Sequence, residues 1–387
     1  MPAVDAETLI AEAREMGPEI IALRAEIEAG RRLPPALVNR LRDARMFQLW
    51  VPDAFGGLEL HPIDFVRVVE ELSRTDGSVG WCVGVCGVCG LMAGALPEHT
   101  VREVFGPDDV VAGSVNPTGR AVAVEGGYRV TGRWAYGSGI DFSSWVVGNC
   151  IVHDGETPRR KASGAPEMQF ILFPRREVEV IDTWRVGGLR GTGSHDFRVD
   201  DVFAPDAHAL PAFAPSGQRR ETLYQTPLIS LFVVALAAVT LGIARAAIDA
   251  GVELASAKTP MGSTVLLRDR PIAQFQIARA EALVRGARAV VFEAIREQWE
   301  EIESGRPPSL EKRIGIRLAC TFAGESCAEA VDLIHRTAGG SAIMESGRID
   351  RCFRDIHAAT QHIGLTTNNY ELAGRALLGL DVGTARF

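Results

Sequence analysis

The first 110 residues place apolar side chains at the spacing of amphipathic helices. One helix is predicted to begin after Asp5, whose side chain can cap it. Pro34-Pro35 predicts the start of another, and a third is predicted over 65–72. The segment 50–58 between them is rich in turn-forming residues. The N-terminal part of the chain is therefore predicted to be helical.

From about Val111 the pattern changes to short apolar or alternating runs, which predict strands. Gly126-Gly127 separates two of these runs, as the turn of a hairpin would. The segment 153–166 is rich in charge, glycine and proline, and it is predicted to be a solvated loop. A β domain therefore follows the helical part.

Helical spacing returns from about Thr226. The segment 228–243 is almost wholly apolar and could be taken for a membrane span. Because Arg245 and Asp249 continue the same helical pattern, a buried helix of a bundle is favoured. Three more helices are predicted, and four long helices make a bundle. They cover 272–299, 309–337 and 354–380.

Composition indicates a soluble enzyme. The 387 residues are 47% hydrophobic and 23% charged, which is close to the globular average and enough for two or three domains. The net charge of -8 argues against nucleic acid or an anionic membrane as the main partner. No basic and then apolar signal sequence opens the chain, so a cytoplasmic location is expected.

The seven cysteines show no disulfide framework and suit a reducing compartment. Cys82, Cys86 and Cys89 recur at i, i+4 and i+7, on one face of a helix. Since further ligands are not evident nearby, burial under the helix is favoured over metal binding, and no metal is expected.

Several motifs, in order along nearly the whole chain, resemble those of the acyl-CoA dehydrogenases. The resemblance implies a mainly α fold with a β domain. Its parts would be an N-terminal α-helical domain over 1–112, a middle β-barrel over 113–222 and a C-terminal four-helix bundle over 223–387. A fold alone does not establish a reaction. The motifs are Val51-Pro52-Asp53 with Gly56-Gly57-Leu58, Glu70-Glu71-Leu72-Ser73-Arg74-Thr75-Asp76, Gly188-Leu189-Arg190-Gly191-Thr192 with Val199 to Pro205, Thr337-Ala338-Gly339-Gly340 and Arg354-Asp355.

The residue that serves as base in the medium- and short-chain dehydrogenases is missing. Its position, just before Gly364, is held by Ile363, which cannot accept a proton. His362 lies beside it, and His357 replaces the second arginine of the family's Arg-Asp-x-Arg segment. Because some members take their base from a distant helix, a dehydrogenase with a relocated base stays open as an alternative. A flavin-free binding subunit is a third possibility.

Two segments resemble the flavin-dependent monooxygenases built on this fold. They are Trp134-Ala135-Tyr136-Gly137-Ser138-Gly139 and, more specifically, Gly188-Leu189-Arg190-Gly191-Thr192-Gly193-Ser194-His195-Asp196. The resemblance implies the oxygenase component of a two-component aromatic hydroxylase. Such an enzyme receives FMNH2 or FADH2 from a separate NAD(P)H-flavin reductase. It adds O2 to form a C4a-hydroperoxide and hydroxylates a small aromatic or polycyclic substrate.

The resemblance also implies roles for single side chains. Ser138 would meet flavin N5, and His362 would face flavin C4a and bond the peroxide, because imidazole changes protonation near neutral pH. Asn116 and His357 are further polar candidates, with an Asn-Pro turn and a surface pairing as their alternatives. Trp81 is an aromatic candidate for the substrate, although core packing is favoured for it. The predicted cofactor-binding residues are Trp134, Tyr136, Ser138, Arg190, Thr192, Ser194, Lys258, Gly339 and Gly340.

Two further expectations concern partners. Lys258 stands where the dehydrogenases carry an arginine that reaches the flavin adenine dinucleotide of a neighbouring subunit, so the choice between FMN and FAD stays open. The apolar helix at 228–243 and the bundle after it, which one chain could scarcely cover, predict a homotetramer. No strand–Gly-x-Gly-x-x-Gly–helix unit is evident, so the chain is not expected to reduce its own flavin.

Overall fold

The N-terminal part of the protein is helical, as predicted. The computed structural model describes residues 5–213 and 219–382. The Asp5 side chain caps the first helix by accepting a hydrogen bond from Thr8 N at 2.8 Å. Asp76 ends α4 and caps α5, since its side chain accepts from Ser78 N and Val79 N. These helices are α1 (Ala6–Glu15), α2 (Gly17–Gly30), α3 (Pro35–Asp43), α4 (Pro62–Thr75), α5 (Gly77–Cys89) and α6 (Glu98–Val104), with 3-10 turns η1 (Asp53–Phe55) and η2 (Gly90–Gly94).

The middle of the chain forms one eight-stranded sheet with the order β6-β7-β2-β1-β3-β5-β8, and β4 pairs with β3. The hairpin predicted at Gly126-Gly127 is confirmed, because Val124 of β1 pairs with Gly127 of β2. β1 also pairs in parallel with β3. The segment predicted as a loop at 153–166 contains the short strand β4. The strands are β1 (Val111–Val124), β2 (Gly127–Gly137), β3 (Trp145–Asp154), β4 (Thr157–Pro158), β5 (Met168–Pro174), β6 (Glu179–Ile181), β7 (His195–Pro205) and β8 (Ala209–Pro211).

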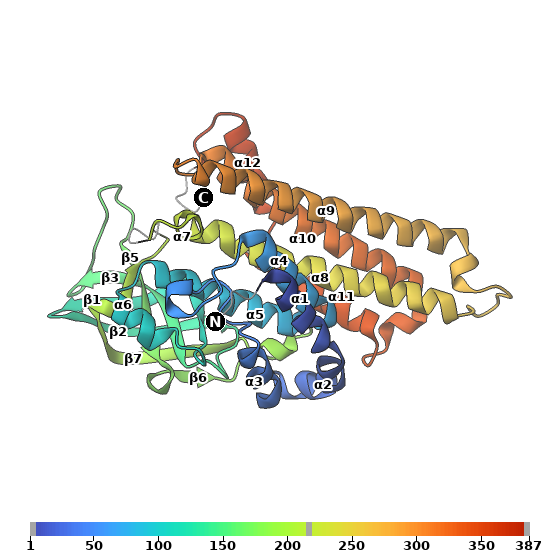
Figure 1. Cartoon of the computed structure of the whole chain (residues 1–387), viewed down its shortest axis with the longest axis horizontal. Helices are drawn as coiled ribbons and strands as arrows, with labels where there is room; N and C mark the ends of the chain where they lie inside the picture. The colour runs from blue at the N-terminus through green and yellow to red at the C-terminus, as the bar shows by residue number, and fades with distance from the viewer. Residues whose placement is uncertain (1–4, 214–218, 383–387) are drawn as a thin grey trace.

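The C-terminal helices pack around α8, which contacts α4, α9, α10 and α11. Figure 1 shows α8, α9 and α10 running side by side and projecting well beyond the sheet. Two helical stretches, Gly77–Gly94 and Leu228–Ala257, are apolar and long enough to cross a membrane, but 94% and 89% of their most apolar windows are buried in the protein. The prediction of a buried bundle helix is therefore confirmed. The helices are α7 (Thr222–Gln225), α8 (Leu228–Ala257), α9 (Pro271–Glu303), α10 (Leu310–Ala338), α11 (Arg348–Ala359) and α12 (Asn368–Leu377).

The prediction of a single helix over 354–380 is wrong, because α11 and α12 are separate helices joined by a turn. A Cβ atom at Gly364 would lie 2.9 Å from Leu236 Cδ1, so glycine lets this turn pack closely against α8. Asn369 Nδ2 donates to the Gly364 carbonyl at 3.2 Å and holds the turn in place. His362 consequently lies in a turn rather than on a helix face.

Helix α5 occupies the junction between the three parts of the protein. It contacts α4, α8, α11, β1 and the 3-10 turn η4 (Arg190–Thr192). Cys82, Cys86 and Cys89 are buried along it, as predicted. Burial raises the pKa of the Cys82 and Cys86 thiols. Residues on α5 therefore reach both the sheet and the bundle.

The contact between α8 and α4 requires glycine. A Cβ atom at Gly242 would lie 2.3 Å from the Glu70 carbonyl oxygen and 2.5 Å from Ser73 Cβ. We expect Gly242→Ala to lower the free energy of unfolding by about 1–3 kcal/mol, since the backbone must shift. Gly286→Ala on α9 is the matched control, because nothing lies within 4 Å of its Cβ position. The control should be neutral or stabilise by up to about 1 kcal/mol. Urea unfolding followed by circular dichroism measures both variants. Equal free energies of unfolding for the two variants would contradict this expectation.

Candidate active site

Three hydroxyl side chains form a buried hydrogen-bonded group, here named the hydroxyl triad (Ser138, Ser194 and Thr192). Ser138 follows the end of β2, and its Oγ lies 2.7 Å from Ser194 Oγ. Ser194 Oγ lies 2.6 Å from Thr192 Oγ1, which donates to the Leu189 carbonyl at 2.9 Å. All three side chains are buried. The triad thus links the end of β2 to the loop over 188–194.

Trp81 of α5 connects the hydroxyl triad with His362. Its indole Nε1–H donates to Ser138 Oγ at 3.0 Å. Its ring also meets the imidazole of His362 edge-on, with ring centroids 6.0 Å apart. Phe232 of α8 lies against the same imidazole, with a centroid distance of 5.3 Å. Residues from the sheet, α5, α8 and the turn before α12 therefore meet in one cluster.

His362 is a neutral hydrogen-bond donor in this environment. Burial, assisted by the nearby positive charge of Arg317, lowers the pKa of His362 to about 4. The Gly364 N–H donates to Nδ1 at 3.0 Å, so Nδ1 carries the lone pair and Nε2 carries the proton. The expectation that this imidazole changes protonation near neutral pH is therefore wrong.

The loop over 188–194 is held by a buried carboxyl group. Asp355 Oδ1 on α11 accepts from Leu189 N at 2.6 Å. Leu189 has a φ of +51°, a left-handed conformation that is rare outside glycine. A Cβ atom at Gly188 would lie 2.0 Å from the Arg354 carbonyl oxygen, so only glycine allows α11 to approach this closely. The hydroxyl triad is thus positioned by α11 as well as by the sheet.

Asp355 belongs to a cluster of charges between α2, α5 and α11. Burial raises the pKa of Asp355 to about 7, and the negative charges of Asp76 and Glu28 act in the same direction. The Leu189 N–H bond and Arg351 oppose this shift. Arg351 lies 2.7 Å from an oxygen of Asp76 and 3.2 Å from one of Glu28. Arg351 therefore pairs with two of these carboxyl groups, and Glu28 also pairs with Arg190 and Arg354.

Trp134 and Tyr136, both predicted to bind a cofactor, occupy very different positions. Trp134 is fully buried, stacks on Phe197 at 5.1 Å and donates its Nε1–H to the Asn149 carbonyl at 2.8 Å. It packs the core of the sheet, which corrects the prediction that it contacts a ligand directly. Tyr136 is 63% exposed with a φ of +68°, and its ring meets Trp184 edge-on. Its ring is accessible to a ligand.

The other two predicted catalytic residues are Asn116 and His357, and their contacts go to groups outside the hydroxyl triad. Asn116 lies inside β1, where the pairing with β3 is irregular, rather than in a turn before the sheet. Its backbone N donates to Ser114 Oγ at 3.4 Å. His357 Nε2 lies 2.9 Å from Asp332 Oδ1 of α10, and its ring meets Phe353. His357 therefore makes the surface pairing that was one of its two alternatives.

Arg190 anchors the loop to α2. It forms an ion pair with Glu28 at 3.2 Å and donates to the Glu28 and Val186 carbonyls. Its guanidinium group thus has three partners within the protein. The arginine contributes to the shape of the loop that carries two of the triad hydroxyls.

Lys258 and the paired glycines lie together, but far from the sheet. Lys258 Nζ donates to the Ala338 carbonyl at 2.7 Å and to Ser341 Oγ at 2.8 Å. Gly339 and Gly340 follow directly in η7 (Gly339–Ile343). Figure 1 shows the connection between α8 and α9 at the opposite end of the molecule from the strands. A single chain therefore does not bring these residues to the hydroxyl triad.

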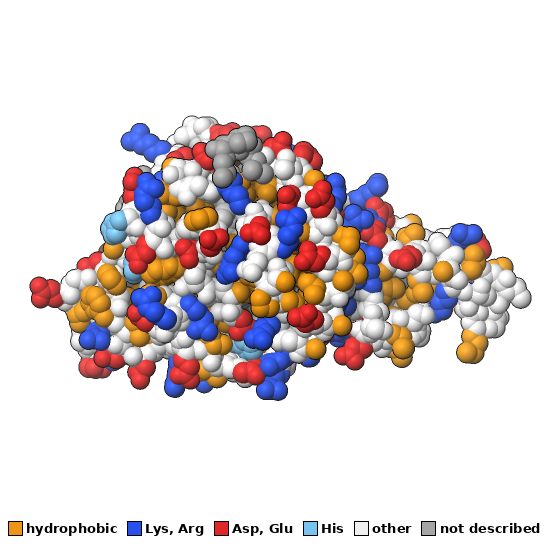
Figure 2. Space-filling view, turned by 60° about the horizontal axis from the view of Figure 1, so that its bottom comes forward, with side chains coloured by type: hydrophobic (Ala, Val, Ile, Leu, Met, Phe, Trp, Pro, Cys, Tyr) orange, Lys and Arg blue, Asp and Glu red, His pale blue; other side chains and the backbone are white. Residues whose placement is uncertain are grey.

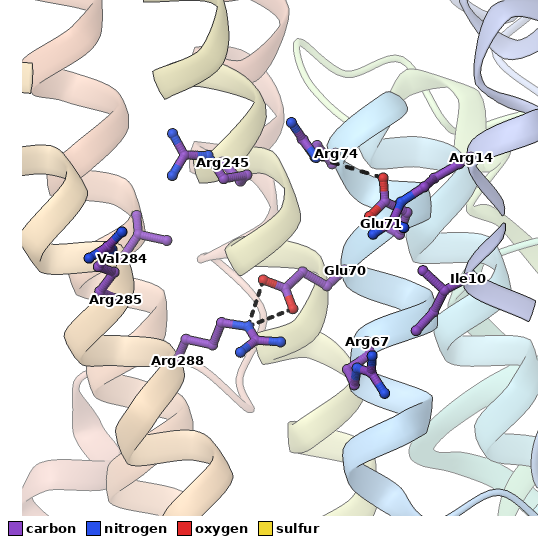
Figure 3. Close-up of a pocket in the computed structure, with 10 residues that line it drawn as sticks. All are labelled: Ile10, Arg14, Arg67, Glu70, Glu71, Arg74, Arg245, Val284, Arg285 and Arg288. Atoms are coloured by element: carbon purple, nitrogen blue, oxygen red, sulfur yellow. Dashed lines mark hydrogen bonds and ion pairs between the residues drawn. The ribbon is translucent and has the colours of Figure 1, made fainter. Parts of the chain in front are cut away.

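A cleft of about 330 Å³ lies between α1, α4, α8 and α9, away from this cluster (Figure 3). Its lining is mainly arginine, yet each of these arginines is paired with a carboxylate. The arginines of the cleft therefore form an ion-pair network that joins α4 to the bundle. This network includes residues of the motif at 70–76. The pairs are Arg14–Glu71, Arg67–Glu7, Arg74–Asp249, Arg245–Glu281, Arg285–Glu281 and Arg288–Glu70.

The sequence analysis missed the roles of two residues of the site, Trp81 and Asp355. The sequence favours core packing for Trp81, and the structure adds its bond to Ser138. Asp355 has a recognisable signal, because Cys352, Ile356 and Ala359 put apolar neighbours on its face of the helix. A carboxyl group within such a face must have a buried partner.

Comparisons with known proteins cover nearly the whole chain. Family models for the acyl-CoA dehydrogenase N-terminal and C-terminal domains match residues 5–99 and 234–367. Indole-3-acetate monooxygenase of Pseudomonas putida is 33% identical over 358 residues, covering 92% of this chain and 89% of that protein.

Two solved structures extend this likeness. The 3-HSA hydroxylase from Rhodococcus sp. RHA1 has a TM-score of 0.91 at 26% identity, covering 98% of this chain and 99% of the other. XiaF from Streptomyces sp., solved in complex with FADH2 and glycerol, has a TM-score of 0.89 at 27% identity, covering 98% and 97%.

The raised pKa of Asp355 predicts how stability depends on pH. Between pH 4 and about 7 the folded protein holds a proton on Asp355 that the unfolded chain has released, so stability falls as pH rises through this window. The loss is at most about 1.4 kcal/mol per pH unit. Asp355→Asn keeps an oxygen that accepts from Leu189 N but does not titrate.

We therefore expect the unfolding midpoint of wild type to fall relative to Asp355→Asn between pH 5 and pH 8. Parallel curves for the two proteins, measured by thermal unfolding in matched buffers, would contradict the assignment.

Proposed function

Since the chain belongs to the acyl-CoA dehydrogenase superfamily and, within it, to the flavin-dependent monooxygenases, we propose that it is the oxygenase component of a two-component enzyme. It receives FMNH2 or FADH2 from a separate NAD(P)H-flavin reductase. With O2 it hydroxylates a small aromatic or polycyclic substrate. The observation that carries the proposal is the cluster of the hydroxyl triad, Trp81 and His362, followed by Ile363 in place of a dehydrogenase base.

The residues of the cluster fit a flavin ring. Ser138 Oγ accepts one hydrogen bond from Trp81 and shares one with Ser194, which leaves it one further position for flavin N5. Tyr136 lies close to Ser138 in sequence, and its exposed aromatic ring offers a surface for a planar ligand. The complex of XiaF with FADH2 supports a reduced flavin in a protein of this shape. When bound, reduced flavin supplies the electrons that activate O2.

His362 suits oxygen chemistry in two ways. Its neutral imidazole holds a proton on Nε2, so it can donate to an oxygen atom without bringing a positive charge into the pocket. Trp81 and Phe232 surround it with apolar surface, which excludes water. The dehydrogenase alternative receives no such support, since Ile363 cannot remove a proton.

The substrate class rests on the relatives. Indole-3-acetate monooxygenase acts on an aromatic compound according to its name, and it resembles this chain over nearly its full length. The rings of Trp81 and Phe232 give the cluster the aromatic walls that such a substrate packs against.

We further propose a homotetramer. The end of the bundle that holds Lys258 is distant from the sheet, and hydrophobic side chains are exposed around it. Figure 2 shows this projecting end with hydrophobic and uncharged side chains and few charged ones. A neighbouring subunit would cover them and bring Lys258 to another chain's flavin site. The exposed residues are Val252, Met261, Val265, Ile272, Phe275, Ile343 and Met344.

The reaction can be tested with flavin reduced outside the protein. The purified protein alone should oxidise no NADH. Supplied with photoreduced FMN or FAD, ¹⁸O2 and indole-3-acetate or a phenol, it should place one ¹⁸O atom in the product, as mass spectrometry would detect. Flavin reduction by an acyl-CoA under anaerobic conditions would instead support a dehydrogenase.

The two histidines give a matched pair of variants. His362→Ala should lower the yield of product per reduced flavin by about tenfold to a hundredfold and raise H2O2 release, because a proton donor is lost. His357→Ala should keep the wild-type yield, since its imidazole pairs with Asp332. The reverse result would make His357 the residue at the reaction centre.

The assembly is tested by light scattering at micromolar concentration, where four chains per particle are expected. Phe275→Asp should dissociate the particle by placing a charge in the covered surface, with circular dichroism unchanged. A monomeric wild type would refute the proposed tetramer.

A further inference from the structure

The direction of each hydrogen bond in the hydroxyl triad can be assigned. The Leu189 carbonyl can only accept, so the single hydroxyl proton of Thr192 lies in that 2.9 Å bond. Ser194 must then donate to Thr192 across 2.6 Å. By the same reasoning Ser138 donates to Ser194 across 2.7 Å. The Trp81 Nε1–H donates to Ser138, so all the bonds run in one direction.

We infer that Thr192 and Ser194 hold Ser138 as a hydrogen-bond acceptor and thereby make the site select reduced over oxidised flavin. The inference rests on the proposed function, in which Ser138 meets flavin N5. Reduced flavin carries a proton on N5, whereas oxidised flavin carries a lone pair there. Ser138 directs its own proton to Ser194, and Trp81 occupies one of its two acceptor positions. The remaining position accepts a proton from N5 and repels a lone pair.

Oxidised flavin can be accommodated only if the triad gives up one hydrogen bond. Ser138 would have to direct its proton to N5 and lose its bond to Ser194. If Ser194 turned its proton to Ser138 instead, Thr192 would donate to Ser194 and lose its bond to the Leu189 carbonyl. Because Thr192 and Ser194 are buried, water cannot replace the lost bond. An unmade hydrogen bond of this kind changes a dissociation constant by roughly tenfold to a hundredfold.

The hydroxyl triad cannot rearrange easily, because the backbone around it is held by further hydrogen bonds. Asp355 holds the Leu189 N–H, and the Thr192 N–H donates to the Leu189 carbonyl at 3.2 Å, so both ends of this residue are anchored. The Gly139 N–H donates to the Thr192 carbonyl at 2.9 Å and joins the two segments that carry the hydroxyls. Thr192 and Ser194 are therefore positioning residues that act on the flavin through Ser138.

The test compares dissociation constants for the two redox forms of the flavin. Fluorescence quenching measures oxidised FMN and FAD, and anaerobic ultrafiltration measures the reduced forms. Wild type should bind the reduced form at least about tenfold more tightly. Ser194→Ala and Thr192→Val each release the Ser138 proton, so the oxidised form should bind about tenfold more tightly than to wild type. Ser194→Thr keeps the hydroxyl and should keep the wild-type ratio.

The reduction potential of the bound flavin provides a second readout that needs no turnover. When the dissociation constant of the oxidised form, divided by that of the reduced form, falls tenfold, the reduction potential of the bound flavin falls by about 30 mV for a two-electron couple. Ser194→Ala and Thr192→Val should therefore move the potential toward that of free flavin. A purely structural role for these hydroxyls would change the unfolding midpoint and leave the potential where it is in wild type.

Ser138→Ala separates the two ways in which the inference can fail. If this variant binds both redox forms as wild type does, Ser138 is not at N5, and that part of the proposed function is overturned together with the inference. If Ser138→Ala weakens the reduced form while Ser194→Ala and Thr192→Val keep the wild-type ratio, only the inference is overturned. Circular dichroism checks folding, and Ser194→Ala carries the test if Thr192→Val does not fold.

Discussion

The hydrogen bond from the Leu189 N–H to the buried Asp355 carboxyl group fixes the segment on which the site depends. The carbonyl of the same residue accepts from Thr192, so Leu189 connects a charge cluster with the hydroxyl triad. Leu189 adopts a left-handed conformation there, which persists because several contacts impose it. Small displacements in active sites have large effects on rate, and this double anchoring restricts them.

The site is assembled from all three parts of the fold. The sheet supplies Ser138, α5 supplies Trp81, and the turn between α11 and α12 supplies His362. Each lies on a segment that is packed by others, and close contacts at Gly188 and Gly364 allow that packing. Ligand sites are common at such junctions, where rigid elements converge. The hydroxyl triad lies where these packed elements meet.

Local patterns predicted most of the fold, and long-range contacts account for what they missed. The Asp5 cap, the hairpin at Gly126-Gly127 and the burial of α8 follow from neighbours in sequence. The break before α12 depends on how Gly364 meets α8, which helical spacing does not encode. The resemblance named Ser138 and His362, but the bond from Trp81 and the low pKa of His362 arise only from packing.

The buried cysteines of α5 bear on the durability of the protein. Cys82 and Cys86 direct their thiols toward the Thr192 and Ser138 carbonyls, so sulfur lies within the shell of the site. A thiol becomes oxidised to sulfenic acid chiefly as the thiolate and where oxidant has access. Burial keeps both thiols protonated and enclosed. An oxidant therefore has little access to either sulfur, although both lie beside the hydroxyl triad.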